Sequence, residues 1–239
     1  MNKIIFNLSK KFKQNRKVYN QNPIRKDYYA DVYKIIKKNN FKNILDIGCA
    51  NGAFSYNLNN QIKIMGIDID DALIRGAQKI NIKRANSNFK NINIFDDSNK
   101  SKKFIKKNIK KFDLVTIFGT FHLFRNYKKT IKILKKLNPK MIVITTMLNR
   151  FGDVSIVHKL NEQKNWDMTY NFFSQKKLVN YFHEAGYNTK ILNYEMKTFL
   201  KRKKNSTRNY HIRKKNNKKI LVNDLGLYFS EKIVIAKKK

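Results

Sequence analysis

Short apolar runs alternate with amphipathic stretches along most of the chain. Compact runs of β-branched residues predict buried strands, and apolar residues three and four positions apart predict helices. We expect strands at 44–47, 62–68, 92–95, 112–118, 141–146, 187–194 and 231–236. We expect helices at 27–39, 52–59, 72–79, 126–137 and 175–185. Ser174 is positioned to cap the start of the last helix, and Gly186 to end it.

Strands that alternate with helices of about ten residues predict an α/β fold with a Rossmann-like, doubly wound sheet. The alternation is interrupted twice, at 147–173, which lacks clear periodicity, and at 196–229. We therefore expect a basic N-terminal arm at 1–26 and one domain at 27–239 that carries these two insertions.

Composition excludes several classes of protein. A hydrophobic fraction of 41% argues against a disordered chain, and no apolar stretch reaches the roughly 20 residues that span a bilayer. The single cysteine, Cys49, rules out an internal disulfide and a cysteine-based zinc site, so we expect no metal. The first residues are basic and lack the apolar core of a signal peptide, which predicts a cytoplasmic location.

The charge is high, with 53 Lys and Arg against 16 Asp and Glu and a net charge of +37. Lys, Asn and Ile together make up 106 of the 239 residues, a bias typical of A/T-rich codons. We interpret codon bias as the main source of the charge. An anionic partner is allowed by this charge but is not demonstrated by it.

The strongest motif is Leu45–Gly52 (LDIGCANG), in which a buried strand leads into a glycine loop and then a helix. Gly48 and Gly52 allow the backbone to turn sharply and to approach a ligand. Ala50 replaces the middle glycine of the dinucleotide fingerprint, which disfavours NAD. The acid Asp46 at the strand end suits a cationic ligand better than a diphosphate.

Carboxylates follow the next two predicted strands. Asp68, with Asp70 nearby, could accept hydrogen bonds from the two hydroxyls of a ribose, and Asp96 could accept one from an adenine amino group. Each acid could instead cap the following helix. Three acids at successive strand ends after a glycine loop nevertheless favour a nucleoside site.

These motifs resemble those of the class I S-adenosylmethionine-dependent methyltransferases, over about residues 41–150 and more loosely at 174–194 and 230–237. The resemblance implies S-adenosyl-L-methionine as cofactor and a seven-stranded sheet whose last strand is antiparallel and lies between strands five and six. It also implies a cofactor site that holds the methionine part, the ribose and the adenine. The residues implied are Asp46, Gly48, Ala50 and Gly52 for the methionine part, Asp68 for the ribose, Asp96 for the adenine, and Ile69 and Phe118 beside them.

Methyl transfer from a sulfonium mainly requires that the acceptor be positioned and water excluded. A general base helps where the acceptor proton is tightly held. Candidate catalytic residues are His122, Asp153 and His158, and candidate substrate-binding residues are Trp166, Tyr170 and Arg208. Packing roles are the alternative for His122 and for the two aromatic residues.

Several acceptors are disfavoured. The Asn/Asp-Pro-Pro-aromatic tetrad of base-amine methylation and the paired glutamates of arginine methylation are both absent after the fourth strand. A hydroxyl or amine of a small acceptor remains. Segments 166–174, 208–210 and 223–227 resemble methyltransferases of bacterial surface-polysaccharide assembly, which implies a carbohydrate-type acceptor in surface glycan biosynthesis.

The basic stretch 197–219 could dock a phosphate-bearing glycan, and it ends in a predicted hairpin of 210–213 and 219–222. Two alternatives stay open. An RNA methyltransferase acting on ribose or a ring nitrogen would use this stretch as its electrostatic footprint. A non-catalytic protein that binds the same cofactor would serve as a partner subunit.

Overall fold

The computed structural model describes residues 27–124, 126–150, 152–159, 167–193, 210–215, 218–223 and 230–239. The predicted arm at 1–26 lies outside the described residues, as do all residues from 194 to 209. No helix in the described part of the chain is both long enough and apolar enough to cross a bilayer.

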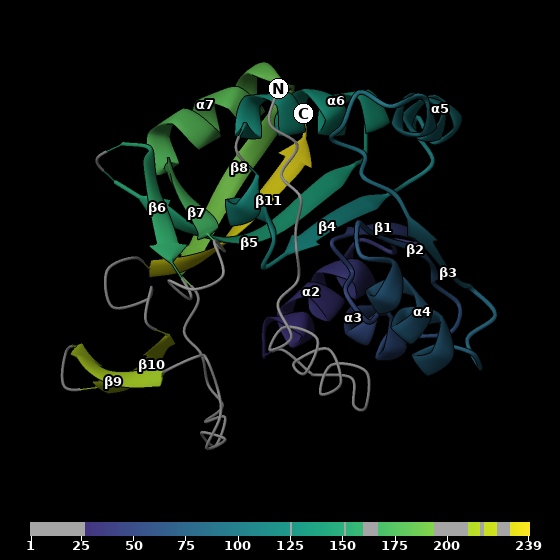
Figure 1. The fold of residues 1–239 in the computed structure, drawn as a ribbon, viewed down its shortest axis with the longest axis horizontal. Helices are drawn as coiled ribbons and strands as arrows, with labels where there is room; N and C mark the ends of the chain where they lie inside the picture. Colours follow the sequence, from purple (N-terminus) through teal and green to yellow (C-terminus); the bar gives the residue numbers. More distant parts are fainter. Residues whose placement is uncertain are drawn as a thin grey trace.

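Seven strands of the nine-stranded sheet follow the order β3-β2-β1-β4-β5-β11-β8, and the other two, described below, join it beside β5 (Figure 1). Their bounds are β1 (Asn43–Ile47), β2 (Lys63–Asp68), β3 (Ser87–Asn91), β4 (Leu114–Phe118), β5 (Met141–Asn149), β8 (Tyr187–Asn193) and β11 (Ser230–Lys238). The first five are parallel, and β11 runs antiparallel to both of its neighbours, β5 and β8. The predicted Rossmann-like sheet, with its last strand inserted antiparallel, is confirmed.

Helices cover both faces of the sheet (Figure 1). One face carries α2 (Asp27–Lys38), α3 (Ala53–Tyr56) and α4 (Asp71–Ile80), and the other carries α5 (Asn99–Lys107), α6 (Tyr127–Leu137) and α7 (Gln175–Glu184). Each face has its own apolar core, because buried strands present side chains to both sides. Val32 and Phe54 anchor the first core, and Leu134 and Phe182 the second.

The third strand lies at 87–91, so its predicted position at 92–95 is wrong. Strand β2 ends at Asp68, which pairs with Asn91, and no partner backbone remains beyond that point. Ile92 and Ile94 are buried in the core nonetheless, as coil. Burial of apolar residues suggested a strand, but a strand also requires a neighbour for its hydrogen bonds.

The sequence prediction missed helix α5. Its N-cap is Ser98, whose side chain accepts a hydrogen bond from the Ser101 N–H. Only Phe104 and Ile105 are apolar among its nine residues, and lysines fill most of the rest. The helical periodicity was therefore too sparse to detect.

The stretch 147–173 is more regular than its sequence suggested. Strand β5 continues to Asn149, and β6 (Val154–Lys159) pairs antiparallel with β7 (Asp167–Ser174). The end of β7 joins the end of β5 in parallel, with Asn149 opposite Ser174. This pairing attaches the first insertion to the sheet.

The later elements agree with prediction. Ser174 caps α7 by accepting a hydrogen bond from the Lys177 N–H, and Gly186 follows the helix with a φ of 92°. The predicted hairpin is present as β9 (Tyr210–Lys215) and β10 (Lys218–Asn223), which form a separate two-stranded sheet.

Candidate active site

The candidate site lies at the edge of the sheet where β1, β2, β4 and β5 end, because parallel strands bring their carboxyl ends together. Three of the segments at this edge are 46–52, 66–70 and 118–122. None of them contains a lysine or arginine, in a chain that has 53. Their charged residues are carboxylates, so this edge suits a cation with hydroxyl groups and does not suit a diphosphate.

Asp46 is a buried carboxyl in β1. Thr116 of the neighbouring strand β4 donates a hydrogen bond to it, with an Oγ1–Oδ1 distance of 2.7 Å. Burial raises the pKa of Asp46 to about 7, the hydrogen bond from Thr116 opposes the rise, and the charge of Asp68 adds to it. A cation at this edge would favour the ionised form. No motif in the sequence indicates that Thr116 supports Asp46.

The loop after β1 is held by β2. The N–H groups of Gly48 and Cys49 both donate to the Ile67 carbonyl, at 2.8 and 3.1 Å. The Ala50 N–H donates to the Asp68 carboxylate at 3.0 Å. Gly48, Ala50 and Gly52 all have positive φ, so the loop is a series of left-handed turns.

The two loop glycines face side chains of the protein itself, and their contact with the cofactor stays a prediction. A Cβ on Gly48 would lie 2.6 Å from Thr120 Oγ1. A Cβ on Gly52 would lie 2.7 Å from Asn81 Nδ2 and 3.0 Å from Phe89. These glycines therefore permit close packing around the loop. Thr120, which packs against Gly48, was not identified from the sequence.

Asp68 ends β2 and links two loops. One carboxylate oxygen accepts from the Ala50 N–H and the other from the Asp70 N–H, each at 3.0 Å. Burial raises the pKa of Asp68, and these two hydrogen bonds oppose the rise. Ile69 follows with 53% of its surface exposed, which places an apolar side chain beside the carboxylate. Asp70 itself caps α4.

Asp96 lies in the loop after β3, not at a strand end. Its Oδ1 accepts hydrogen bonds from the Ser98 N–H, the Ser98 hydroxyl and the Ser101 hydroxyl at the start of α5. Burial acts to raise the pKa of Asp96, but the bonds from Ser101 and Ser98 outweigh it and hold the pKa below its usual range. The Oδ1 atom of Asp96 therefore has the alternative role, in which the acid stabilises the start of the next helix. Contact of Asp96 with an adenine stays a prediction.

Phe118 ends β4 within a cluster of aromatic rings. Its ring centroid lies 5.2 Å from Tyr28, 5.5 Å from Tyr29 and 4.9 Å from Phe54. The N-terminal helix α2 therefore packs onto the same strand end as the glycine loop. A contact of Phe118 with the cofactor stays a prediction.

His122 lies just past β4 in the short helix η1 (Phe121–Leu123). Asn171 of β7 donates to the backbone carbonyls of His122 and Phe124, at 3.1 and 3.3 Å. The Asn171 side-chain oxygen accepts from the Ser155 hydroxyl at 2.7 Å. The buried Asn171 therefore fixes the backbone that carries His122, and sequence reasoning did not identify it.

Asp153 connects the starts of α6 and α7. Its carboxylate accepts from the Ser174 N–H at 2.7 Å, from Lys177 Nζ at 3.2 Å and from the Tyr127 hydroxyl at 3.4 Å. Burial and then the charge of Asp153 raise the pKa of Tyr127 to about 12, so the phenol stays a donor. These contacts give Asp153 a structural role, and its predicted catalytic role has no support from them.

The remaining predicted acceptor residues are only partly described. His158 pairs with Met168 in the β6–β7 ladder, and Tyr170 pairs with Ile156, but the side chains of His158 and Tyr170 lie outside the described part. Trp166 and Arg208 lie wholly outside it. Among the residues that are described, no group of three His, Cys, Asp or Glu side chains could hold a metal.

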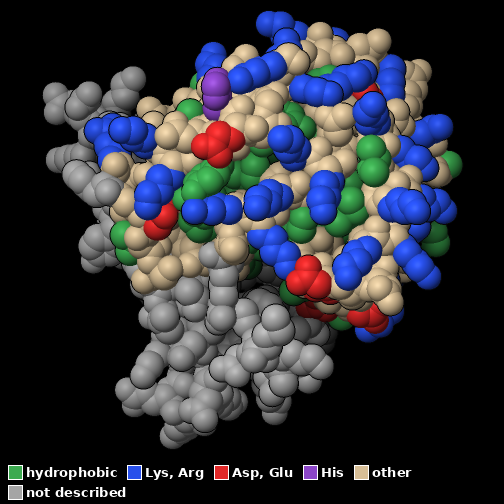
Figure 2. All heavy atoms as spheres, turned by 90° about the horizontal axis from the view of Figure 1, so that it is seen from above, with side chains coloured by type: hydrophobic (Ala, Val, Ile, Leu, Met, Phe, Trp, Pro, Cys, Tyr) green, Lys and Arg blue, Asp and Glu red, His purple; other side chains and the backbone are tan. Residues whose placement is uncertain are grey.

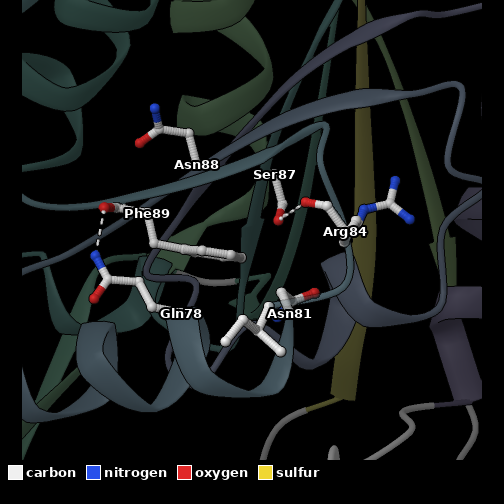
Figure 3. A pocket seen from close by; sticks show the side chains of 7 residues that line it. Gln78, Asn81, Arg84, Ser87, Asn88 and Phe89 are labelled. Atoms are coloured by element: carbon white, nitrogen blue, oxygen red, sulfur yellow. Dashed lines mark hydrogen bonds between the residues drawn. The ribbon is translucent and has the colours of Figure 1, made fainter.

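A hollow of 230 Å³ lies between the end of α4 and the start of β3 (Figure 3). In the close-up Gln78 reaches the carbonyl of Phe89, and Ser87 reaches that of Arg84. This hollow is at the amino ends of the strands, whereas the acids Asp46 and Asp68 are at the carboxyl ends. It is therefore separate from the candidate site.

The fold and this edge define an open α/β protein with a site for a cationic nucleoside. S-adenosylmethionine fits the donor set, since it combines a sulfonium, an ammonium group, a ribose and an adenine. Asp46 offers a buried carboxylate, Asp68 a second one, and Ile69 an exposed apolar surface. Burial, followed by the charges of Asp46 and Asp68, raises the pKa of the Cys49 thiol, which disfavours a thiolate nucleophile.

Comparisons with known proteins agree with an S-adenosylmethionine site. A family model described as a methyltransferase domain matches residues 37–186. The chain therefore belongs to the class I S-adenosylmethionine-dependent methyltransferases, whose cofactor is S-adenosyl-L-methionine. No curated protein matches the sequence.

Solved structures share the fold at low sequence identity. The N-terminal domain of EvdMO1, crystallised with S-adenosylhomocysteine and D-fucose, has a TM-score of 0.61 at 12% identity, covering 95% of each chain. A methyltransferase from Methanosarcina mazei has a TM-score of 0.54 at 16% identity, covering 82% of this chain and 92% of its own. The YcgJ protein of Bacillus subtilis has a TM-score of 0.57 at 11% identity, covering 88% and 99%.

Proposed function

We propose that the protein transfers the methyl group of S-adenosylmethionine to a hydroxyl or amine of a small, carbohydrate-type acceptor. The observation that carries this proposal is the attachment of β7 to both β5 and η1. Through these contacts β7, a described strand of the first insertion, lies against the end of β5 and against η1. An insertion held this firmly suits a small acceptor that must be oriented.

On this proposal the cofactor is held by groups from β1, from the end of β2 and from the loop after β3. Asp46 would bind its ammonium group, Asp68 its ribose, and Asp96 its adenine, with Ile69 beside the adenine. When bound, the cofactor supplies a methyl group that is already activated by the sulfonium. Asp68 also holds Ala50, so cofactor binding and loop geometry depend on the same carboxylate.

The acceptor side would be formed by η1 and β7. His122 would accept the proton of a sugar hydroxyl as the new bond forms, and Asn171 would keep its backbone in place. For an amine acceptor, which can be neutral at its nitrogen, His122 would serve only to orient it. The second insertion, 196–229, would complete the cap, with Arg208 near an acceptor phosphate.

One comparison supports a carbohydrate acceptor. The N-terminal domain of EvdMO1 was crystallised in the presence of D-fucose, and its fold matches over 95% of this chain. The sequence resemblance of 166–174 to polysaccharide methyltransferases points the same way. Both support an acceptor of this class, and the role in surface glycan biosynthesis rests on the sequence resemblance alone.

The test is formation of S-adenosylhomocysteine in the presence of S-adenosylmethionine and a panel of acceptors. The panel contains free deoxyhexoses, nucleotide-linked sugars and transfer RNA, and mass spectrometry identifies the methylated product. We expect methylation of a sugar, with turnover strongly reduced in His122→Gln at unchanged affinity for S-adenosylhomocysteine. Asp71→Asn, on the exposed face of α4, is the matched control and should behave as wild type.

Two results would replace this proposal. Methylation of RNA alone, with steep salt dependence, would favour an RNA methyltransferase. Binding of S-adenosylhomocysteine without turnover on any acceptor would favour a non-catalytic partner protein.

A further inference from the structure

The two faces of the sheet differ sharply in charge. Helices α5 and α6 together carry ten lysines and no acidic residue. Helices α2 and α4, of similar total length, carry five basic and three acidic residues. Codon bias acts on both faces alike, so it does not account for the difference. We call the surface formed by α5 and α6 the α5–α6 face.

Most of these lysines are free to meet a partner. Nine of the ten are exposed, and Lys129 is half-buried. Among the described residues, Lys129 is the one lysine of these ten that forms an ion pair, and its partner is Asp97 at 2.9 Å. Figure 2 looks onto the side of the molecule with α5, α6 and α7, where blue Lys and Arg side chains are spread over the described part of the surface, with a few red acidic ones among them.

An apolar hollow lies among the lysines. It measures 310 Å³ and is lined by Ile105, Ile109 and three lysines, Lys102, Lys106 and Lys136. Ile109 is 47% exposed, although it is a large apolar residue. Green apolar patches are visible between the blue side chains in Figure 2.

We propose that the α5–α6 face binds the surface of a bilayer that contains anionic phospholipids. Lysines attract the phosphate groups of such a surface, and an exposed apolar side chain between them can enter the boundary with the acyl chains. Ile109 is placed for this role at the rim of the hollow. Each anionic lipid headgroup carries a single negative charge, and these charges are spread over the bilayer surface. The exposed lysines of α5 and α6 are spread over their face in a similar way.

Nucleic acid fits this face less well. Single-stranded RNA is bound by stacking bases on aromatic rings, and the aromatic residues of α5 and α6, Phe104 and Tyr127, are buried. The apolar hollow would also have no partner on a phosphate backbone.

Binding here would leave the candidate active site accessible. The α5–α6 face covers one side of the sheet, and Asp46 and Asp68 lie at its carboxyl edge. This inference does not depend on the identity of the acceptor, and it goes beyond the proposed function. It would bring the enzyme to any acceptor that is carried by a lipid.

The experiment measures co-sedimentation with vesicles of phosphatidylcholine alone and of phosphatidylcholine with phosphatidylglycerol. A variant with three charges removed is compared with a control that loses three charges from the opposite face. The variant is Lys102→Gln/Lys106→Gln/Lys136→Gln, and the control is Lys37→Gln/Lys38→Gln/Lys79→Gln. All six lysines are exposed, so both proteins should fold, which thermal unfolding and titration with S-adenosylhomocysteine would verify.

We expect wild type to bind anionic vesicles and not neutral ones. Each lysine near an anionic surface strengthens binding about fivefold, so the variant should bind about a hundredfold more weakly while the control is little changed. Ile109→Asn, which alters no charge, should also weaken binding. Equal losses in variant and control, or no loss in either, would overturn the proposal.

Transfer RNA is the competing ligand in the same assay. If the variant loses affinity for RNA and keeps its affinity for vesicles, the face binds nucleic acid and the proposal fails. Cofactor titration separates this outcome from failure of the proposed function, because Asp46 and Asp68 are unchanged in every variant.

Discussion

The carboxylate of Asp68 accepts a hydrogen bond from the backbone N–H of Ala50 at 3.0 Å, so the end of β2 holds the loop that follows β1. Its second oxygen accepts from the Asp70 N–H at the same distance. One side chain therefore sets the geometry of two loops at the carboxyl edge. Loss of this carboxylate should affect both cofactor binding and local order.

We expect Asp68→Ala to weaken binding of S-adenosylhomocysteine by a factor of about 10 to 150. This range corresponds to about 1.5–3 kcal/mol, typical of hydrogen bonds to charged groups. Isothermal titration measures the affinity, and thermal unfolding measures the accompanying loss of stability. Asp71→Ala removes a nearby exposed carboxylate that pairs only with Arg75 within α4, so it should leave affinity unchanged. An unaltered affinity in Asp68→Ala would contradict the assigned site.

Asp46 should make stability and cofactor binding depend on pH in opposite directions. Its pKa is raised from 3.8 to about 7, so the folded protein loses stability as pH rises from about 4 through about 7. The ionised form, which binds an ammonium group, is populated above about pH 7, so affinity for S-adenosylhomocysteine should rise over the same range. Unfolding and titration at several pH values measure both effects.

Asp46→Asn is the control for this pH dependence, since it keeps the shape and removes the titrating group. The difference between wild type and this variant should diminish at low pH. If the two proteins show the same pH dependence of affinity, then another group is responsible.

Gly48→Ala should destabilise the protein for two separable reasons. The φ of 72° is unfavourable for alanine by roughly 1–2 kcal/mol, and the new Cβ would lie 2.6 Å from Thr120 Oγ1. Gly119→Ala isolates the first effect, because Gly119 has a φ of 63° and no atom within 4 Å of a new Cβ. Gly152→Ala has neither problem and should be near neutral.

Chemical denaturation ranks these three variants. We expect Gly48→Ala to lose the most stability and Gly152→Ala the least. Thr120→Ala should recover part of the loss at Gly48 by removing the nearest atoms. The same loss with threonine or alanine at position 120 would show that the contact is unimportant.

Asn171→Asp should reduce methyl transfer without reducing cofactor affinity. The carboxylate cannot donate to the carbonyls of His122 and Phe124, so the backbone that carries His122 would shift. Each lost buried hydrogen bond costs about 1–3 kcal/mol, which lowers the unfolding temperature as well. Turnover and binding are measured separately. A parallel fall in cofactor affinity would indicate general disruption instead of a positioning role.

The order of strands and helices was readable from the sequence because it depends on local periodicity. The glycine loop, Asp68 and the final strand could all be placed from short motifs. The third strand could not, since its bounds depend on where β2 ends and not on the burial of Ile92 and Ile94. Helix α5 was missed because lysines hid its periodicity.

The site was predictable as a set of strand ends but not as a set of contacts. Asp46 was identified from the motif, whereas its donor Thr116 is 70 residues away and no spacing rule links them. Thr120, which fills the space above Gly48, was invisible for the same reason. Asp153 looked catalytic from its chemistry, and only its three partners showed that it joins α6 to α7.

By itself the sequence determined the class of fold, the cofactor family and the carboxylates at the strand ends, since each rests on residues close together along the chain. The tertiary structure decided which glycine packs against which side chain, how Asn171 holds η1, and that the lysines of two helices share one face. These relationships join residues far apart in sequence, and hydrogen bonding and packing between elements fix them only after the sheet has formed.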